Sequence, residues 1–520
     1  MSLPANASAT DPANRRSPQL QAAVEIVLIF LIFFIHAAWP APEVNEPHYL
    51  GKAMHYWNPQ WCANDFFFQT SDAHQVFYWT VGWLTRWLPL SQVAWCGRLA
   101  TWALLAWAWR RLSFALVPAP FYAVLSAALF LVLNDRMHMA GEWVIGGVEA
   151  KGFAYVFVLL GLERLVRARW NTAILAFGAA SALHVVIGAW AVLATAIVWI
   201  ASRDRPTLTA LAPALALGLV LALPGLLPAL WLTWGVPGDT VREANRIYVY
   251  ERLYHHLLPT RFHPWFVARH VLLILALGLL VPAAPASASF RRLRAFVAAA
   301  VLFAVIGMGI GLAAPLALDF AASVLRYYWF RMSDVMVPLA VALIATAVVR
   351  NWQFSWGKMH AAALVGAMLA VSLCLGHTVW RRAEDGRPPA DSNIANLPAW
   401  RELCEWIAEH TPADAVFLTP RLDQTFHWYA GRAEVVSRKD IPQDARGIVE
   451  WWRRNRALYA TSSADEGSWR DSLAELGSQR LIELGREFGA DYVVTSAYPP
   501  LNLERQGPPS ASFALYHLPK

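Results

Sequence analysis

Apolar stretches that lack any charged residue alternate with short polar segments along the first 380 residues of the chain. Residues 112–134, 170–202 and 206–238 contain no Asp, Glu, Lys or Arg. Each stretch can supply the roughly 20 apolar residues that a helix needs to cross a bilayer. The pattern predicts roughly eleven membrane-spanning helices, at residues 20–40, 94–110, 117–134, 152–167, 170–183, 185–201, 208–233, 270–287, 295–317, 335–349 and 359–379.

Basic residues gather at alternate ends of these predicted helices. Their clusters lie at residues 15–16, 110–111, 164–169, 203–205, 291–294 and 350–358. All of these clusters fall on one side if the spans alternate, and the positive-inside rule identifies that side as the cytoplasm. We therefore expect the N-terminus inside. The expected outer segments are residues 41–93, 135–151, 234–269 and 318–334, together with everything after Arg381.

Two details of the spans bear on this topology. The fifth and sixth predicted spans are short and meet at His184. One continuous helix there would place the later arginine clusters on the wrong side, so we predict two short spans or a re-entrant pair. The first apolar stretch, residues 26–39, is followed by no small-residue cleavage site, so we expect it to be retained as a helix and not removed as a signal peptide.

Composition agrees with a membrane protein. The chain is 57% hydrophobic and only 15% charged, whereas soluble domains carry about 25% charged residues. Many of its 27 Trp residues lie near the ends of the predicted spans, where membrane proteins place them at the interface. The net charge of +7 reflects cytoplasmic segments and does not indicate a nucleic-acid partner. The four scattered Cys residues form neither a metal motif nor a disulfide framework.

After Trp380 the chain becomes charged and polar, beginning with a linker at residues 381–393. Amphipathic spacing and short apolar runs predict alternating helices and strands, which indicate an α/β layer structure. The expected helices are 398–410, 446–457 and 468–488, and the expected strands lie within 411–420 and at 433–437, 491–497 and 513–518. We therefore expect a transmembrane unit at 1–380 and an α/β domain at 381–520 that covers or recognises something above the membrane.

The first outer segment, residues 41–93, offers the candidate catalytic carboxylates. Glu46 comes a few residues after the first span, so it should lie near a wet membrane surface. Because Pro47 favours a helix start there, a helix cap is the alternative role for Glu46. Asp65 and Asp72 are reserve candidates, and both also suit the starts of helical turns.

Other side chains of the outer segments are candidates for substrate binding. The first segment supplies His48, Tyr49 and His74, for which aromatic packing is the alternative. The second supplies Glu142, Glu149 and Lys151, which equally suit a structural ion pair. The third supplies Arg242, Arg246, Arg252, His255 and His256. Arginine suits phosphate because its planar fork matches the oxygens, although lipid headgroups or the tail would also attract it.

The fourth outer segment brings ionisable residues to the start of the tenth span. Arg326, Arg331 and Asp334 lie at or near its first turn. Charged residues at membrane depth are costly, so a functional role is the default interpretation. Snorkelling of the side chains to the interface is the alternative.

This arrangement resembles the GT-C class of glycosyltransferases, which use polyprenyl-phosphate sugar donors. Protein O-mannosyltransferases and the aminoarabinose transferase of lipid A belong to that class. The resemblance rests on a first helix, a long acidic outer segment, a many-helix body and the tail segment 398–420, which looks like the helix–strand opening of the outer domain in many bacterial members. The chain also looks like a group of uncharacterised bacterial membrane proteins.

The resemblance implies sugar transfer from a lipid-linked phosphate to an acceptor hydroxyl on the outer face of the bacterial inner membrane. Glu46 would act as general base, and the outer arginines would stabilise the leaving phosphate. Members of the class often carry an Asp–Glu pair where this chain has Asn45–Glu46. No metal ligands are assigned, and a divalent cation is the one cofactor left open.

Two other classes of protein would share these features. A transporter would also have many spans, but transporters usually show repeated halves and broken helices, and no convincing internal repeat is evident. An inactive relative acting as a scaffold is the second alternative. The sugar, the donor lipid and the acceptor do not follow from the residues.

Overall fold

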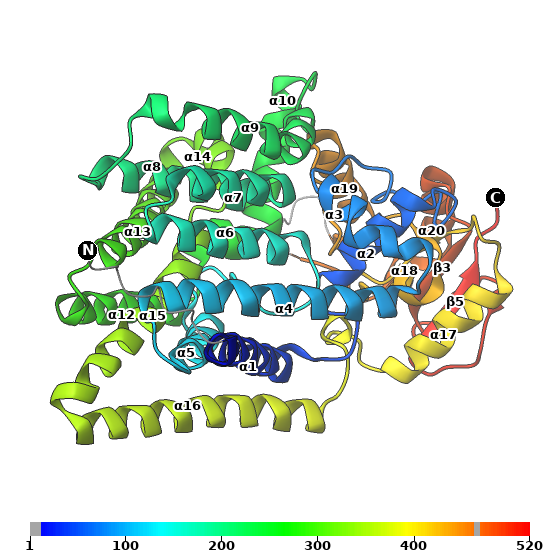
Figure 1. The fold of residues 1–520 in the computed structure, drawn as a ribbon. Coiled ribbons are helices and arrows are strands. Elements are labelled where there is room, and N and C mark those ends of the chain that lie inside the picture. The colour runs from blue at the N-terminus through cyan, green and yellow to red at the C-terminus, as the bar shows by residue number, and fades with distance from the viewer. Residues whose placement is uncertain (1–11, 462–467) are drawn as a thin grey trace, which may run out of the picture.

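The computed structural model describes residues 12–461 and 468–520, and it shows a bundle of long helices with a small sheet at one end (Figure 1). Each of the eleven predicted spans coincides with one helix. These helices are α1 (Pro12–Ala37), α4 (Leu90–Leu116), α5 (Tyr122–Met137), α6 (Ala150–Val166), α7 (Trp170–Leu183), α8 (Val185–Ala201), α9 (Leu208–Trp231), α12 (Pro264–Leu280), α13 (Ala288–Ala313), α15 (Arg331–Ser355) and α16 (Gly357–Glu384).

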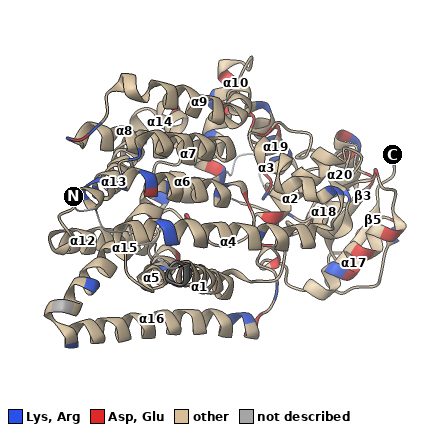
Figure 2. Cartoon of the chain, viewed as in Figure 1, with Lys and Arg blue, Asp and Glu red and all other residues tan. Residues whose placement is uncertain are grey.

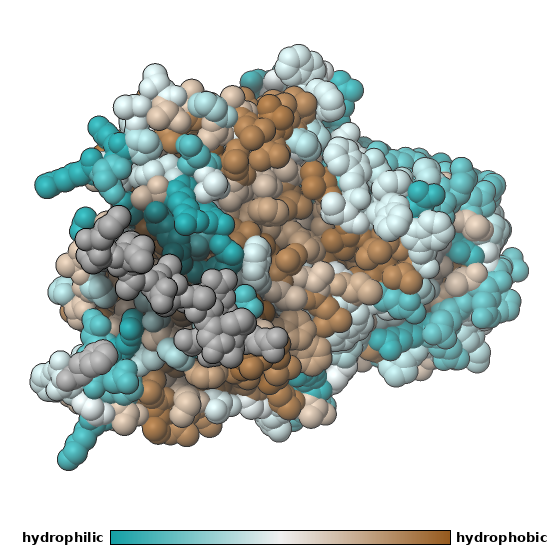
Figure 3. Space-filling view, in the orientation of Figure 1, coloured by the Kyte–Doolittle hydropathy of each residue, from teal (hydrophilic) through white to brown (hydrophobic). Residues whose placement is uncertain are grey.

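The outer surface of the bundle is apolar. Six of the described helices are long and apolar enough to cross a membrane, and α7 and α8 are shorter apolar helices. Large side chains point outward, such as Leu279 of α12 and Leu373 of α16, which are 82% and 73% exposed. Figure 3 shows the resulting apolar band between two hydrophilic ends. Extended apolar surface of this kind marks contact with lipid, and the chain is a multi-pass membrane protein.

Helix α15 forms the centre of the bundle. It is buried over most of its length and packs against α5, α12 and α13, whereas α16 is exposed along nearly its whole length. Elsewhere small residues let helices approach closely. A Cβ atom added to Gly178 of α7 would lie 2.3 Å from the carbonyl oxygen of Gly218 in α9. Such contacts between backbones require glycine, as is common between membrane helices.

The basic clusters lie together at the end of the bundle opposite the sheet. Glu163 of α6 pairs with Arg111 of α4 and with Arg167 just after α6, at 3.7 and 2.7 Å. Arg292 of α13 pairs with Asp204, which follows α8. Charged residues are sparse along the middle of the helices (Figure 2). These contacts join the predicted clusters 110–111, 164–169, 203–205 and 291–294 at one end of the bundle, and the predicted break between α7 and α8 is present at His184.

The first outer segment forms α2 (Glu46–Trp57), α3 (Gln75–Trp79) and the 3₁₀ turn η1 (Val81–Arg86). An acidic and aromatic segment directly after the first membrane helix could form amphipathic helices that lie on the membrane surface. Helix α2 instead packs between α4, η1 and the C-terminal part of the chain, and more than half of its residues are buried. Tertiary packing of the C-terminal part over α2 is the reason for this difference.

The remaining outer segments also fold into short helices. Residues 238–261 form α10 (Gly238–Arg246), the π-helical turn η2 (Ile247–Arg252), α11 (Tyr254–Leu257) and η3 (Pro259–Arg261). The segment before α15 contains α14 (Leu318–Leu325). Two further 3₁₀ turns, η4 (Val281–Ala283) and η5 (Ala314–Leu316), continue α12 and α13.

The C-terminal part contains a five-stranded mixed sheet in the order β2-β1-β3-β5-β4. Strand β1 pairs in parallel with β2 and β3, and β5 pairs antiparallel with β3 and β4. Its elements are η6 (Pro389–Asp391), α17 (Leu397–His410), β1 (Val416–Leu418), α18 (Phe426–Ala430), β2 (Ala433–Glu434), α19 (Ala445–Tyr459), η7 (Leu473–Leu476), α20 (Gly477–Phe488), β3 (Tyr492–Ser496), β4 (Arg505–Gln506) and β5 (Phe513–His517).

The α/β pattern predicted for the tail is confirmed, but the strand expected at 433–437 ends at Glu434 and one helix boundary is also wrong. The helix expected at 468–488 begins only at Leu473, as a 3₁₀ turn, because Trp469 forms a β-bridge with Ala460. Ser472 caps the following turn through its side chain. Helix α18 and strand β4 are short, and the sequence pattern did not predict them.

The sheet shares a hydrophobic core with the outer segments. Phe67 and Phe68 of the first segment and Ile247 of η2 are buried in one apolar cluster with Leu418 of β1 and Trp451 of α19. Burying such side chains is worth about 1.5–3 kcal/mol each. The C-terminal part is therefore packed firmly onto the outer segments, and the polar groups between them are enclosed.

Candidate active site at the junction of the bundle and the C-terminal part

Glu46 lies at the first turn of α2 and is fully buried. Arg98 of α4 donates two hydrogen bonds to it, Nε to Oε1 and Nη2 to Oε2, both at 2.6 Å. The backbone N–H groups of Glu43 and Val148 donate to Oε2 and Oε1 at 2.8 and 2.9 Å. The expectation of a wet, accessible Glu46 is wrong. The Glu46 carboxylate links the start of α2 to Arg98 of α4 and to the loop at Val148. Both of its oxygens accept hydrogen bonds from these protein groups.

Asp65 is also buried, and its carboxylate links the first outer segment to strand β2. Its Oδ1 accepts from the backbone N–H of Phe68 at 3.0 Å, and its Oδ2 accepts from that of Glu434 in β2 at 2.9 Å. Burial raises the pKa of the Asp65 carboxyl to about 7. The position at the start of a turn was predicted, and the contact with β2 adds a link to the C-terminal part.

His427 of α18 completes this link. Its Nε2 lies 3.1 Å from the carbonyl oxygen of Pro47 in α2, and its Nδ1 lies 3.2 Å from Oε1 of Glu434. Burial opposes a charged imidazole, but the hydrogen bond to Glu434 and the nearby carboxylates raise the pKa of His427 to about 9. The imidazole is thus charged at neutral pH and holds α2 against the sheet.

Asp72 differs from the other two carboxylates because one of its oxygens is free. Oδ1 accepts from the backbone N–H of His74 at 2.6 Å. Oδ2 lies 3.9 Å from Nζ of Lys52, with the buried hydroxyl of Tyr78 nearby, and no described residue donates a hydrogen bond to it at ordinary hydrogen-bond distance. Burial would raise the pKa of the Asp72 carboxyl, but His74 and Lys52 hold it below its usual value. An ionised carboxylate with an unoccupied oxygen can accept a proton from a substrate.

Aromatic and imidazole rings connect Asp72 to the start of α15. The hydroxyl of Tyr49 lies 3.4 Å from Nε2 of His74. The ring of His74 is 5.3 Å from that of His184, and Nη1 of Arg331 donates to Nε2 of His184 at 3.2 Å. Four elements therefore meet at one place, which we call the junction. They are helix α2, the loop before α3, the break between α7 and α8, and the first turn of α15.

Arg331 and Lys151 share acidic partners in the second outer segment. Arg331 lies 2.9 Å from Glu142, and Lys151 lies 3.9 Å from Glu142 and 3.5 Å from Glu149. The amide of Asn45 contacts both oxygens of Glu149 at 3.4 Å. The five side chains form one charged network, as the clustering of Glu142, Glu149 and Lys151 in the sequence predicted.

Asp334 of α15 holds the loop that carries Glu142 in place. Its carboxylate accepts from the backbone N–H groups of Met139, Ala140 and Glu142 at 2.7, 2.9 and 3.3 Å. These bonds hold the loop that carries Glu142 at the start of α15. The carboxylate was a candidate for substrate contact, and its oxygens instead position the loop.

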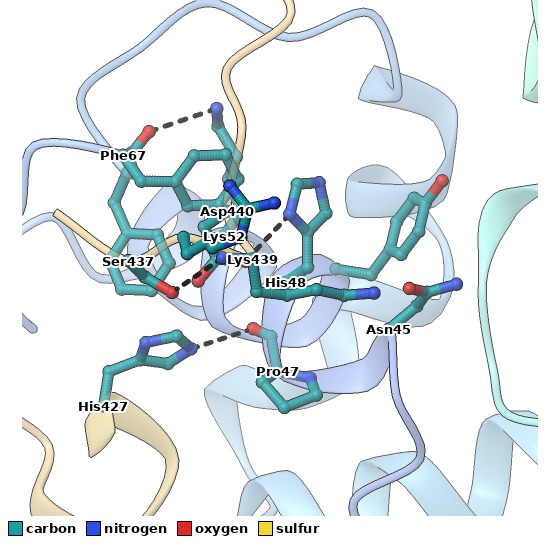
Figure 4. A network of polar contacts seen from close by, with 12 residues as sticks. Asn45, Pro47, His48, Lys52, Phe67, His427, Ser437, Lys439 and Asp440 are labelled. Carbon is teal, nitrogen blue, oxygen red and sulfur yellow. Dashed lines mark hydrogen bonds and ion pairs between the residues drawn. The ribbon is translucent and has the colours of Figure 1, made fainter. Parts of the chain in front are cut away.

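The C-terminal part contributes directly to the junction. Oδ1 of Asp440 lies 3.0 Å from Nδ1 of His48 in α2, and both side chains are mostly buried. Figure 4 shows this pair beside Lys52, with the side chain of Lys439 extending towards Asn45. The segment between β2 and α19 therefore contacts helix α2 of the first outer segment directly.

The third outer segment reaches the same place through Arg252, His255 and His256. Arg252 donates to the carbonyl oxygens of Arg438 and Lys439 at 3.1 and 3.2 Å. Nδ1 of His256 lies 2.5 Å from the carbonyl oxygen of Ala140, and the His255 ring contacts that of His256 in a tilted arrangement, with their centroids 4.1 Å apart. Burial and the nearby cations lower the pKa of His255 to about 4.

Three predicted residues lie away from the junction. Arg242 pairs with Asp239 on the surface, and Arg246 pairs with Asp319 of α14 at 2.5 Å, with both arginines more than half exposed. Arg326 hydrogen-bonds Asn245 at the end of α10. The common helical face of Arg242 and Arg246 therefore points away from the other candidates.

Several residues of the junction were not predicted from the sequence to be site residues. They are Lys52, Arg98, His184, Lys439 and Asp440. A local signal existed for Lys52, which follows His48 by four residues and so shares its helical face. No local signal exists for Lys439 and Asp440, because their partners lie hundreds of residues away. Within the described residues, no group of three or more His, Cys, Asp or Glu side chains is placed to hold a metal ion.

Comparisons with known proteins cover different parts of the chain. A family model described as a domain of unknown function, DUF6798, matches residues 398–458. The search of curated proteins found no match. Among solved structures, ArnT from Cupriavidus metallidurans, bound to undecaprenyl phosphate, is similar over 96% of this chain and 98% of its own, with 16% identity and a TM-score of 0.37. At that TM-score the likeness does not by itself establish a shared activity.

Proposed function

We propose that the protein is a glycosyltransferase of the GT-C type. It transfers a sugar from a polyprenyl-phosphate donor to an acceptor hydroxyl at the junction of the helical bundle and the C-terminal part. The supporting observation is Asp72, a buried carboxylate with one unoccupied oxygen beside Lys52, His74 and the charged network of Arg331. A lipid-linked donor suits this place because its chain can lie along the apolar bundle surface while its phosphate reaches the cations.

Asp72 is the general base in this proposal. The acceptor oxygen loses a proton as it attacks the sugar carbon, and Oδ2 of Asp72 takes that proton. Glu46 and Asp65 are less suitable, because hydrogen bonds from protein groups occupy both oxygens of each. The role first assigned to Glu46 thus moves to one of the reserve candidates.

The leaving lipid phosphate gains negative charge as the glycosidic bond breaks. Fixed cations at the membrane surface stabilise that charge, because their positions are set before the reaction. Arg331 of α15 and Lys151 of α6 are held by Glu142 and Glu149, so they are positioned cations of this kind. The ring of Tyr328 lies under the guanidinium of Arg331 at 3.9 Å and helps to hold that cation in place.

The proposal includes an orientation and a division of the chain. The basic end of the bundle faces the cytoplasm of a bacterial inner membrane, by the positive-inside rule. The junction then opens to the outer side. Residues 1–380 form the transmembrane unit, and residues 381–520 form the domain that covers the site.

The test is transfer by purified protein in nanodiscs, supplied with polyprenyl phosphates that carry a radiolabelled hexose or pentose. With water as the acceptor hydroxyl, release of the labelled sugar from the lipid, and with it of polyprenyl phosphate, is measured for the parent protein and for Asp72→Asn. Loss of the base should lower the rate by about 10²–10⁴-fold. The matched control is Asp239→Asn, a carboxylate of another outer segment whose side chain is 90% exposed, and it should leave the rate unchanged.

Two outcomes would contradict the proposal. The first is lipid-phosphate release that is equal in Asp72→Asn and in the parent protein. The second is uptake of a solute into proteoliposomes without any lipid-dependent sugar transfer, which would instead identify a transporter.

A further inference from the structure

The three parallel strands of the C-terminal sheet end at one edge, where the strand order reverses. Strand β1 lies between β2 and β3 and runs parallel to both. The chain passes from β1 to β2 on one side and then to β3 on the other side, so the order reverses at β1. Open α/β sheets bind their ligands outside the carboxyl ends of the strands at such a point. The residues that follow these three strands are therefore candidates for binding.

Two arginines follow β1 and β2 and lie against one aromatic ring. Arg421 follows β1 and Arg438 follows β2. Their guanidinium carbons lie 5.4 and 5.6 Å from the centre of the Trp469 ring. The two cations can be no further apart than these two distances together, and burial and the charge of Arg438 lower the pKa of Arg421. One ligand of two or three sugar rings can therefore contact both arginines.

Neither arginine side chain is used to hold the fold together. Among the described residues, neither guanidinium has a hydrogen-bond or ion-pair partner, and Nε of Arg421 is buried. Burial lowers the pKa of each arginine, although Asp471 acts on Arg421 and Glu251 acts on Arg438 in the opposite direction, from beyond ion-pair distance. Both guanidinium forks are thus available to a negatively charged ligand.

Hydroxyl groups and a second ring lie at the same edge, where β3 ends. Ser472 follows Trp469 closely in the chain, and its hydroxyl is hydrogen-bonded to that of Ser496 at the end of β3. The Ser496 hydroxyl also donates to the carbonyl oxygen of Tyr498 at 2.8 Å, and the side chain of Tyr498 is 73% exposed. The segment from Trp469 to Ser472 therefore runs across the ends of all three strands.

We propose that Arg421, Arg438 and Trp469 form a binding site for an acidic saccharide, a chain of sugar rings that carry carboxylate groups. Each guanidinium fork matches the two oxygens of one carboxylate. Aromatic rings offer apolar faces to the C–H groups of sugars, and the nearby hydroxyls suit sugar hydroxyls. Two cations spread along one ring fit an extended saccharide better than a compact anion, which needs its cations around a single point.

This saccharide site adjoins the candidate active site. Lys439, the residue after Arg438, extends towards Asn45 of the first outer segment (Figure 4). Arg252 of η2 holds this part of the chain in place by donating to the carbonyl oxygens of Arg438 and Lys439 at 3.1 and 3.2 Å. The saccharide would then be the acceptor whose hydroxyl attacks the sugar donor. That assignment rests on the proposed function, whereas the binding itself does not.

Binding is measured directly, so that it does not depend on transfer activity. Purified full-length protein in nanodiscs is titrated with a hexamer of glucuronate and, separately, with the neutral hexamer of glucose. The acidic hexamer should bind more tightly, and its advantage should shrink as salt is added, because salt screens partly exposed charges. In Arg421→Gln the affinity for the acidic hexamer should fall about 10- to 100-fold, as expected when a charged hydrogen-bond partner is lost. Arg421→Lys should restore only part of it, because a point charge cannot reproduce the fork.

Two further variants separate binding from folding. Arg438→Gln should weaken binding of the acidic hexamer in the same way as Arg421→Gln. Because neither side chain bonds to the described part of the chain, both variants should keep the melting temperature of the parent protein. Arg505→Gln is the matched control, since Arg505 is an exposed arginine of β4, at the sheet edge opposite β2, and it should bind as the parent does.

The outcomes distinguish this saccharide site from the proposed function. Failure of the acidic hexamer to bind, equal affinities for the acidic and neutral hexamers, or unchanged binding in both Arg421→Gln and Arg438→Gln overturns the proposal. Binding that depends on Arg421, in a protein without any sugar transfer, supports the saccharide site and rejects the glycosyltransferase. Sugar transfer by a protein that does not bind the acidic hexamer rejects the saccharide site alone.

Discussion

At the scale of single residues, the same kind of side chain takes different roles according to its neighbours. Glu46, Asp65 and Asp72 are all buried carboxylates of the first outer segment. Arg98 and two backbone N–H groups occupy Glu46, and two backbone N–H groups occupy Asp65. Only Asp72 of the three keeps an oxygen without a hydrogen bond from the described residues. Whether a buried carboxylate has a structural or a catalytic role thus depends on whether one of its oxygens is left without a hydrogen bond.

The pair of Glu46 and Arg98 leads to a prediction about stability. Glu46→Gln removes the negative charge and leaves Arg98 buried without its partner, which typically costs about 3–5 kcal/mol. We expect a clearly lower melting temperature in detergent and a lower yield of folded protein. Glu483→Gln in α20 is the control, because it makes the same substitution in an ion pair whose two side chains, Arg480 and Glu483, are 46% and 48% exposed. If the Glu46→Gln protein has the melting temperature of the parent protein but has lost transfer activity, Glu46 has a catalytic role and not a structural one.

At the scale of elements, packing decides how close two helices lie and which faces they hide. Helix α2 has a polar face that would suit water, yet it is enclosed because α18 and the segment after β2 cover it. Helices α7 and α9 make the most extensive contact between two helices of the bundle. Their small residues allow this contact, since Gly178 and Gly225 face the opposite backbone directly.

Gly178→Ala tests the contact between α7 and α9. The added methyl group would lie 2.3 Å from the carbonyl oxygen of Gly218, so the two backbones must move apart. Overpacking of this kind costs about 1–3 kcal/mol, and thermal unfolding in detergent should show it. Gly278→Ala in α12 introduces the same methyl group into open space. Equal melting temperatures for the two variants would contradict the close approach of α7 and α9.

At the scale of the whole molecule, charge and polarity define three zones. A basic end, an apolar band and a polar end with the sheet follow one another along the bundle (Figures 2 and 3). The candidate active site lies between the apolar band and the polar end. A substrate with a lipid tail and a polar head would have to meet the protein at this boundary.

Reporter fusions test the orientation of the whole molecule. A periplasmic reporter fused after Lys520 should be active, and the same reporter after Arg205 should be inactive, because the basic clusters are expected inside. A cytoplasmic reporter should give the reverse pattern at both positions. Activity of the cytoplasmic reporter after Lys520 would place the junction on the inner side and would remove the outer-face transfer from the proposal.

The sequence by itself determined the helices of the bundle and the α/β character of the tail. Uncharged apolar stretches of membrane length and clustered arginines are local properties, so the eleven helices and the common end of the basic clusters followed from them. Much of the charged network could also be predicted, because Glu142, Glu149 and Lys151 lie close together in the chain. Boundaries such as the start of η7 were missed, since a distant β-bridge sets them.

Only the tertiary structure decided which candidates meet and which oxygens remain free. Arg98 lies 52 residues from Glu46, and Asp440 lies 392 residues from His48. No periodicity links residues so far apart, because their contact depends on how the C-terminal part docks on the outer segments. Arg242 and Arg246 had the spacing of a binding face but point to the surface, whereas Lys439 had no signal and lies at the junction. Burial and hydrogen bonding are properties of the packed chain, and they set the charge and the availability of each carboxylate.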